Sequence, residues 1–257
     1  PEFESIADKI PENEKYDTLI LDEGQDIINF PYITVLNSLL KGGWQHGSWR
    51  IFYDSNFQTR IYCTMDFDVL EMLKGFGPVL PRLTHNCRNP RPIIVQTCLV
   101  TGSDLNTKGA GDGPDVEIHF YETSDHARGL LNRILEKLGE HRVSPGEITI
   151  LSPIPWARSV VSELFTSRGS RIKVLQGSIQ ETFPHSKLTF STIADFKGLE
   201  NRFIILADME DIDSSAAVTA AIYVGMTRAR VKLWLLVSRA IKKKYEEILL
   251  KNLPGIH

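Results

Sequence analysis

Two adjacent acidic residues follow a short apolar run near the start of the chain. Residues 17–26 read DTLILDEGQD, and the apolar run at 19–21 suits a strand buried on both faces of a parallel sheet. Asp22 and Glu23 come next, at the carboxyl end of that strand, where open α/β sheets place their ligands. In a nucleotide hydrolase, the first of two such acids holds Mg²⁺ and the second orients and deprotonates the attacking water. We therefore expect Asp22 to bind the metal and Glu23 to act as the general base.

Four more blocks with polar side chains follow along the chain. Residues 49–62 predict a second buried strand that ends in Asp54, with Gln58 four residues later. Two of the remaining blocks carry an arginine, whose permanently charged, rigid fork of donors suits the charge that develops on a transferring phosphoryl group. These three blocks are residues 83–90 (LTHNCRNP, with Arg88), 191–200 (STIADFKGLE, with Glu200) and 223–230 (YVGMTRAR, with Arg228).

In this order, the five blocks resemble motifs II to VI of the superfamily I DNA helicases of the UvrD/Rep/PcrA type. The resemblance extends from residue 17 to about residue 237, which is most of the chain. It implies an enzyme that uses ATP and Mg²⁺ and couples ATP hydrolysis to movement on single-stranded DNA and to duplex unwinding. The expected partner is single-stranded or partly duplex DNA, with a nuclease or repair protein as a further expectation.

The resemblance also assigns roles to individual side chains. Gln58 would contact the γ-phosphate and couple hydrolysis to DNA, and Arg88 and Arg228 would act as solvent-facing arginine fingers across an interdomain cleft. Glu200 would accept a hydrogen bond from the ribose, and Gln25 is assigned to nucleotide binding. The implied catalytic set is therefore Glu23, Gln58, Arg88 and Arg228, with Gln25 and Glu200 for the nucleotide and Asp22 for the metal.

The phosphate-binding loop that such enzymes carry, G-x-x-x-x-G-K-[ST], is missing from this sequence. Gly42-Gly43 is followed by Trp44, and the glycine-rich stretch at 109–113 contains no lysine and is interpreted as a surface turn. Residues 1–3 resemble the remnant of a cleaved fusion tag. We therefore expect a truncated chain that begins just before motif II.

Three positions depart from the family pattern at residues that would contact the adenine or the DNA. Cys87 stands where the family has a tyrosine against the adenine, and Ala194 stands where it has a histidine near DNA. Thr64 stands where it has a stacking tryptophan. Each stacked base is worth roughly 1–3 kcal/mol, so we expect a weaker DNA grip unless Tyr62 or Phe67 takes over.

Composition agrees with a globular protein from a reducing compartment. Of the 257 residues, 42% are hydrophobic and 24% are charged, and the net charge is −3, so any DNA binding must use a local basic patch. The three cysteines are odd in number and lack metal-type spacing, which predicts free thiols. No apolar run is long enough for a membrane span and no signal peptide is visible, so we expect a cytoplasmic protein without a membrane partner.

Strand and helix patterns alternate along the chain, which predicts an α/β fold with parallel sheets flanked by helices. With the resemblance, this becomes a RecA-like P-loop NTPase: the back half of a first RecA-like domain at 4–80 and a second at 81–257, with a hinge at 78–81. Strands are expected at 17–22, 49–54, 115–121, 147–152, 171–175, 187–192, 202–207 and 231–237. Helices are expected near 29–41, 66–74, 90–101, 124–140, 156–168, 214–229 and 239–252.

The first two strands should be neighbours, because the fold that is implied pairs motif II with motif III. The strand of the missing phosphate loop would lie on the far side of residues 49–54. We therefore expect an apolar edge there, covered by another molecule or by a rearranged N-terminal segment.

Two alternatives stay open. The first is an RNA-directed helicase of the other superfamily I branch, which usually has proline at the position of Tyr62 and lacks the tyrosine at Tyr223. The second is a non-catalytic module with a helicase-like fold that binds nucleic acid or a nuclease. An intact phosphate-binding loop upstream of Glu4 would favour the motor, and a degenerate one would favour the module.

Overall fold

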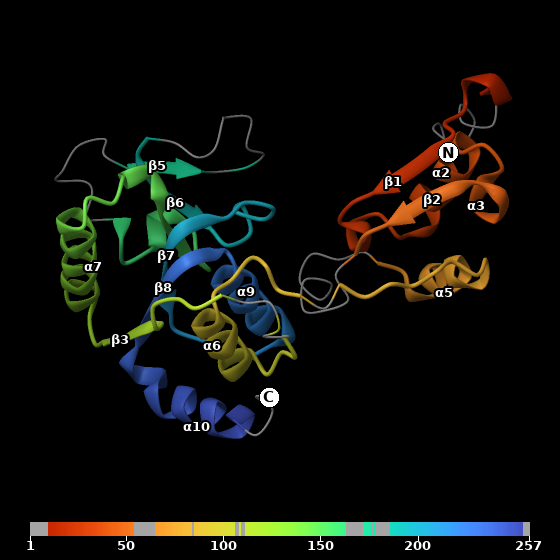
Figure 1. The fold of residues 1–257 in the computed structure, drawn as a ribbon. Helices are drawn as coiled ribbons and strands as arrows, with labels where there is room; N and C mark the ends of the chain where they lie inside the picture. Colours follow the sequence, from red (N-terminus) through yellow and green to blue (C-terminus); the bar gives the residue numbers. More distant parts are fainter. Residues whose placement is uncertain are drawn as a thin grey trace. The chain divides into compact units, whose positions relative to one another are not determined.

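The computed structural model describes residues 10–53, 65–83, 85–105, 108, 111–162, 172–175, 177 and 186–253. The chain divides into two compact units, Pro1–Leu83 and Thr84–His257, which are described separately (Figure 1). The predicted boundary at residues 80–81 lies slightly before this division.

Unit 1 contains a pair of parallel strands at its centre. Strand β1 (Thr18–Leu21) pairs in parallel with β2 (Ser48–Ile51), which confirms that the two expected strands are neighbours. Their alternate residues Leu19, Leu21, Trp49 and Ile51 pack into the core of the unit, as the two-residue period of a strand requires. The opposite face is open, and Ile20 on it is 61% exposed.

Short helices complete unit 1 on the core face of this sheet. Helix α2 (Phe30–Leu39) begins where the Asn29 side chain accepts a hydrogen bond from the Tyr32 N–H, 3.2 Å away, and Pro31 lies in its first turn as expected. Asp66 caps α5 (Phe67–Gly75) in the same way. The remaining elements are η1 (Glu12–Glu14), η2 (Gly24–Asp26) and α3 (Gly43–His46).

Unit 2 is built on a six-stranded sheet in which every neighbouring pair is parallel. The strand order is β3-β8-β7-β4-β6-β5, so consecutive strands are joined by crossovers. This confirms the predicted α/β class with parallel strands and is consistent with a RecA-like fold. The strands are β3 (Glu117–Tyr121), β4 (Ile148–Ser152), β5 (Ile172–Leu175), β6 (Leu188–Thr192), β7 (Asn201–Met209) and β8 (Ala229–Ser238).

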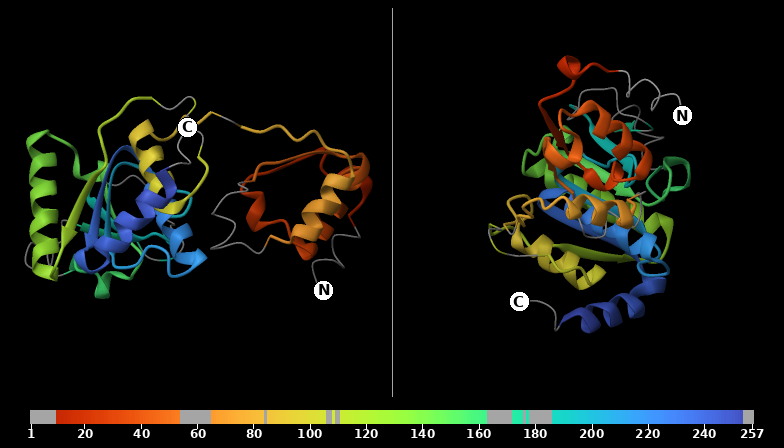
Figure 2. Two further views of the ribbon diagram at one scale, coloured as in Figure 1. Left: turned by 90° about the horizontal axis from the view of Figure 1, so that it is seen from below. Right: turned by 90° about the vertical axis from the view of Figure 1, so that its right-hand side faces the viewer.

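Helices cover both faces of this sheet (Figures 1 and 2). Helix α7 (Ser124–Glu140) packs its apolar side on one face, against Ile205 and Ala207 of β7 among others. The other face carries α9 (Ala216–Thr227), where a methyl group built on Gly225 would lie 3.1 Å from Leu206. Helices α6 (Arg91–Thr101) and α10 (Lys242–Asn252) lie on the same side as α9. Short 3-10 turns join these elements: η3 (Pro145–Glu147), η4 (Trp156–Arg158) and η5 (Arg239–Ile241).

The expected elements agree with the structure to within a few residues, with one exception. The helix expected at 156–168 is wrong at its start, because residues 156–158 form the 3-10 turn η4 between two prolines and a serine. Residues 163–170 lie outside the described part of the chain. None of the helices within the described residues combines the length and the apolar character needed to cross a bilayer.

Candidate active site

The acidic pair of unit 1 forms a tight turn at the carboxyl end of β1. Glu23 adopts the left-handed backbone conformation, with φ of 51°, which costs a residue other than glycine roughly 1–2 kcal/mol. The Asp22 carboxylate accepts a hydrogen bond from the Glu23 N–H at 2.9 Å, and this bond stabilises the turn. Both side chains are exposed. Residues held in such a conformation are often found at functional sites, and the role of this acidic pair stays a prediction.

The residues after this pair hold the turn against β2. The Gly24 N–H donates to the Phe52 carbonyl at 2.7 Å, and a side chain at Gly24 would bring its Cβ within 2.4 Å of Ile51. A larger residue at position 24 would therefore have to displace the Ile51 side chain. Gln25 is fully buried, and its amide donates to the Glu23 carboxylate. This arrangement suits a residue that orients Glu23 better than the direct nucleotide contact expected for Gln25.

The remaining unit 1 candidates fall beyond the described residues. Asp54, Gln58, Tyr62 and Thr64 all lie in the segment 54–64, so the role expected for Gln58 stays a prediction. Phe67, the other candidate for base stacking, is 66% exposed at the first residue of α5. It is available for contact and is not a core aromatic.

In unit 2, Glu200 lies between two arginines. Its carboxylate accepts Arg88 through Nε at 3.1 Å on one oxygen and Arg230 at 3.1 Å on the other. The guanidinium groups are about half exposed and Glu200 is about one-third exposed. Arg230, on β8, therefore belongs to this cluster as well. The expected ribose acceptor is an ion-pair partner here.

Arg228 joins the same cluster from the end of α9. Strand pairing places it there, because the Asn201 N–H donates to the Arg228 carbonyl at 3.1 Å and Glu200 directly precedes Asn201. The Arg228 guanidinium donates to the Leu199 carbonyl at 3.4 Å. The side chain is only 4% exposed, so the expectation that Arg228 faces solvent is wrong. The helix end on which it lies is packed between α6 and the sheet, and Arg88 alone is exposed as expected.

Asn89 connects the turn of Arg88 to the turn of Arg228. Its side-chain N–H groups donate to the carbonyls of Thr227, at 2.9 Å, and Ala229, at 2.7 Å, on either side of Arg228. Asn89 is 5% exposed. Sequence analysis missed this residue. Its only signal was an amide next to a candidate arginine, which by itself predicts no distant partner.

The loop before Glu200 is held by its own side chains. Thr192 donates its hydroxyl to Asp195 at 2.7 Å and accepts the Asp195 N–H at 3.0 Å, while Phe196 is fully buried. Gly198 has φ of 78°, a conformation that glycine adopts at little cost, and so brings the chain round to Glu200.

This cluster lies at the amino-terminal edge of the unit 2 sheet. Glu200 directly precedes β7 and Arg228 directly precedes β8, and the two strands are parallel. An open α/β sheet binds its own ligand at the opposite, carboxyl-terminal edge. Arg88, Arg228 and Arg230 therefore do not lie where the unit 2 sheet would bind a ligand of its own. In unit 1, by contrast, Asp22 and Glu23 follow the carboxyl end of β1.

Within the described residues, no group of three or more His, Cys, Asp or Glu side chains is placed to hold a metal ion. Magnesium in nucleotide hydrolases is bound through one or two carboxylates together with phosphate oxygens and water. The exposed carboxylate of Asp22 at a strand end fits that requirement, and the function of Asp22 as a metal residue stays a prediction.

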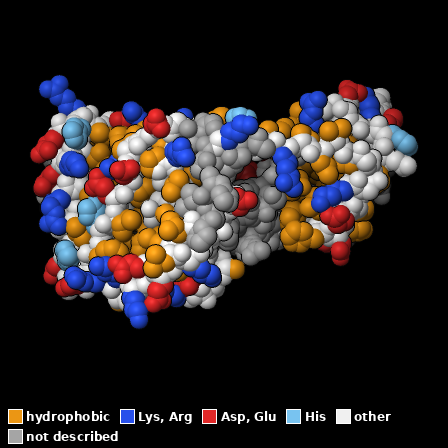
Figure 3. Space-filling view, turned by 60° about the horizontal axis from the view of Figure 1, so that its bottom comes forward, with side chains coloured by type: hydrophobic (Ala, Val, Ile, Leu, Met, Phe, Trp, Pro, Cys, Tyr) orange, Lys and Arg blue, Asp and Glu red, His pale blue; other side chains and the backbone are white. Residues whose placement is uncertain are grey.

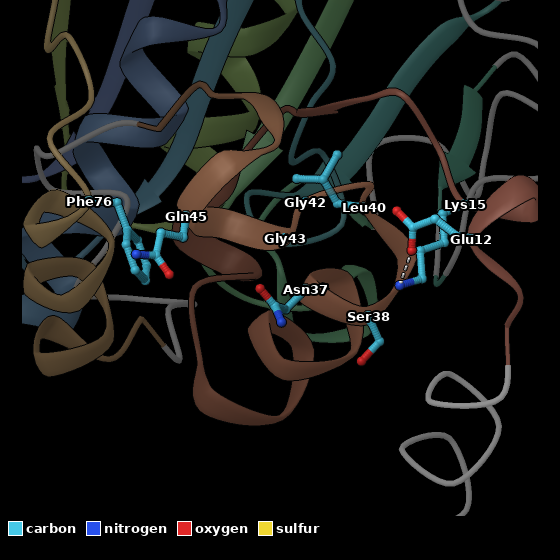
Figure 4. Close-up of a pocket in the computed structure, with 9 residues that line it drawn as sticks. All are labelled: Glu12, Lys15, Asn37, Ser38, Leu40, Gly42, Gly43, Gln45 and Phe76. Atoms are coloured by element: carbon cyan, nitrogen blue, oxygen red, sulfur yellow. Dashed lines mark ion pairs between the residues drawn. The ribbon is translucent and has the colours of Figure 1, made fainter.

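A shallow pocket of about 530 Å³ opens elsewhere on unit 1 (Figure 4). The ion pair between Glu12 and Lys15, at 2.8 Å, lies at one end of it, and Phe76 lies at the other. None of the candidate residues lines it. We therefore do not place the chemistry in this pocket.

The fold and the site together define an α/β protein with parallel strands, an acidic turn in one unit and an arginine cluster in the other. No family model matches the chain, and no curated protein matches its sequence. Among solved structures, the chain is similar to the C-terminal domain of a possible DNA helicase from Lactobacillus plantarum WCFS1. That likeness has 16% identity and a TM-score of 0.44, over 59% of this chain and 86% of the other. It is too distant to indicate what this protein does.

Proposed function

We propose that this chain belongs to an ATP-dependent DNA helicase or translocase, with the candidate acids Asp22 and Glu23 in unit 1 and the candidate arginines Arg88 and Arg228 in unit 2. The enzyme would couple ATP hydrolysis to movement on single-stranded DNA. Its cofactors would be ATP and Mg²⁺, and Asp22 would hold the metal, which neutralises phosphate charge when bound.

The convergence of three distant segments supports this proposal most directly. Arg88, Glu200 and Arg228 are far apart in the sequence, yet hydrogen bonds and ion pairs link their segments at one edge of the unit 2 sheet. The cluster carries more positive than negative charge, and guanidinium groups in a fixed arrangement stabilise the charge on a transferring phosphoryl group.

In unit 1, the acidic turn supports the other half of the proposal. Glu23 would orient and deprotonate the attacking water, and the buried Gln25 amide would keep the Glu23 carboxylate in place. Glu23 has a left-handed backbone directly after β1, and its side chain is exposed.

The test is Glu23→Gln in the intact protein, by which we mean this chain together with the phosphate-binding loop that the resemblance implies. Because glutamine keeps an oxygen that can accept from Gln25, the turn should persist and ATP binding should be retained. ATP hydrolysis should fall by orders of magnitude, since positioning and proton transfer at the attacking water are lost. Glu14→Gln, a change of an exposed acid in the same unit, is the matched control and should hydrolyse ATP at the parental rate. A Glu23→Gln protein as active as its parent would contradict the assignment.

One observation favours a second candidate, the non-catalytic binding module. Arg228 is buried and Glu200 is held in two ion pairs, which also suits a structural role. An intact protein that binds DNA but hydrolyses no ATP, with or without Glu23, would support this candidate over the motor.

A further inference from the structure

We infer that Asn89 is a positioning residue that fixes Arg88 and Arg228 relative to one another. This inference rests on the proposed function, since it assigns to Asn89 the placement of groups that would act on a nucleotide. Asn89 itself would touch no substrate.

The geometry at Asn89 connects both arginine-bearing turns. On one side, its single Nδ2 group donates to the carbonyls of Thr227 and Ala229, which flank Arg228. On the other side, the backbone N–H groups of Asn89 and Arg88 both donate to the Asn86 side-chain oxygen, each at 3.0 Å. A shift of Asn89 must therefore move Arg88 and Arg228 relative to one another.

The carbonyl groups of Thr227 and Ala229 lie at the ends of their elements, where the regular hydrogen-bond pattern stops. Thr227 is the last residue of α9, and the last carbonyls of a helix have no partner within it. Ala229 begins β8 at a register shift, where the ladder with β7 is interrupted between Asn201 and Phe203. An amide with two N–H donors serves both carbonyls at once, which neither a hydroxyl nor a carboxylate can do.

Arginine fingers depend strongly on such placement. A displacement of about 1 Å at a reacting group can lower a rate roughly 100-fold even when the change is made elsewhere. Asn89 donates to the carbonyl groups of both residues that flank Arg228. The placement of the Arg228 guanidinium therefore depends on a side chain that lies 138 positions before Thr227 in the sequence.

The experiment compares Asn89→Ala with Asn252→Ala in the intact protein. Asn252 also donates its amide to a backbone carbonyl, that of Leu99 at 2.9 Å, and it is the last residue of α10 in the same unit. Both variants should lose thermal stability. Only Asn89→Ala should lower kcat for ATP hydrolysis, by roughly 10- to 100-fold, with KM for ATP nearly unchanged. A kcat equal to that of the parent, or a loss matched by Asn252→Ala, would overturn the inference.

Asn86→Ala is the variant to measure if Asn89→Ala does not fold. Asn86→Ala removes the acceptor of Arg88 N–H and leaves the bonds to Thr227 and Ala229, so it should lower kcat less while retaining the fold. Parental kcat in Asn86→Ala would then count against the inference.

The inference can fail separately from the proposed function. In the 257-residue chain, the Nε–H resonances of Arg88 and Arg228 should both shift in Asn89→Ala and should stay in place in Asn252→Ala. If these resonances do shift but the intact parent hydrolyses no ATP, the proposed function fails. If the parent is active and the resonances stay in place, only the role of Asn89 fails.

Discussion

At the scale of single residues, the two candidate arginine fingers, Arg88 and Arg228, differ in their surroundings. The Arg88 side chain is 49% exposed and pairs with Glu200, whereas Arg228 is 4% exposed at the packed end of α9. Exposed ion pairs contribute little to stability, while a buried charged side chain is costly to disturb. The same chemical group should therefore respond differently to removal at the two positions.

We predict that Arg88→Ala and Arg228→Ala both lower ATP turnover in the intact protein by roughly 1,000-fold or more, as loss of an arginine finger does. Their stabilities should differ: Arg88→Ala should stay within about 0.5 kcal/mol of the parent, and Arg228→Ala should lose about 1–3 kcal/mol. Denaturant unfolding and steady-state ATP hydrolysis measure these effects. Arg133→Ala, an exposed position on α7, is the control. Parental turnover in either variant would show that its arginine is structural.

At the scale of elements, a charged contact joins β3 to β8, its neighbour in the sheet. The Glu117 carboxylate accepts Lys232 at 2.5 Å and also faces His119, at 3.4 Å, and Lys137, at 3.5 Å. Partial burial would raise the pKa of Glu117, but the hydrogen bond from Lys232 and the charges of Lys232 and Lys137 outweigh it, with a smaller contribution from Trp234. Together they lower the pKa of Glu117 to about 2.

A lowered pKa in the folded protein predicts how stability depends on pH. The contribution of Glu117 is fully present above its ordinary pKa of 4.5 and is lost as pH falls from 4.5 toward about 2. Allowing for solvent screening, we expect this loss to be about 1–2 kcal/mol in the parent and absent in Glu117→Gln. The unfolding free energies of the parent and of Glu117→Gln should therefore differ at pH 5 and approach one another as the pH falls to 2. Glu136→Gln, at an exposed position of α7, should keep the parental slope, and a parallel pair of curves for Glu117→Gln would contradict the prediction.

At the scale of the whole molecule, the two units are unequal. Unit 2 has a six-stranded sheet with helices on both faces, whereas the described part of unit 1 pairs only β1 with β2 and leaves one sheet face open. Hydrophobic side chains are visible on the surface of unit 1 (Figure 3). The exposed large hydrophobic residues of this unit include Ile20, Phe52 and Phe67. Parallel sheets are usually covered on both faces. The expected cover for the edge of β2 stays a prediction, because the N-terminal nine residues lie outside the described part.

We predict that the 257-residue chain by itself neither hydrolyses ATP nor unwinds DNA. Its sequence lacks the glycine-rich loop and lysine that would hold the phosphates in line with the attacking water. Positioning can account for roughly 7–11 kcal/mol of a reaction barrier, so the remaining activity should not exceed background. The measurement is phosphate release by the purified chain with and without single-stranded DNA. DNA-stimulated release would contradict the prediction.

Local sequence patterns determined the types of the elements and most of their positions. Apolar runs of strand length, capping residues and helical periodicity act over a few residues, so β1, β2 and helices such as α7 could be predicted without knowledge of the fold. The same holds for the acidic pair, because Asp22 and Glu23 follow directly on β1. The wrong start of the helix at 156–168 arose because two prolines and a serine favour a short turn there.

Only the tertiary structure decided how the distant candidates meet. The burial of Arg228 depends on how α9 packs, the ion pair of Arg230 with Glu200 depends on the pairing of β7 with β8, and the position of Asn89 depends on both. The physical reason is that strand order and register bring together residues that are 29 to 140 positions apart in the sequence. Local patterns predict which residues can do chemistry, and packing decides which of them are near one another and how far each is exposed.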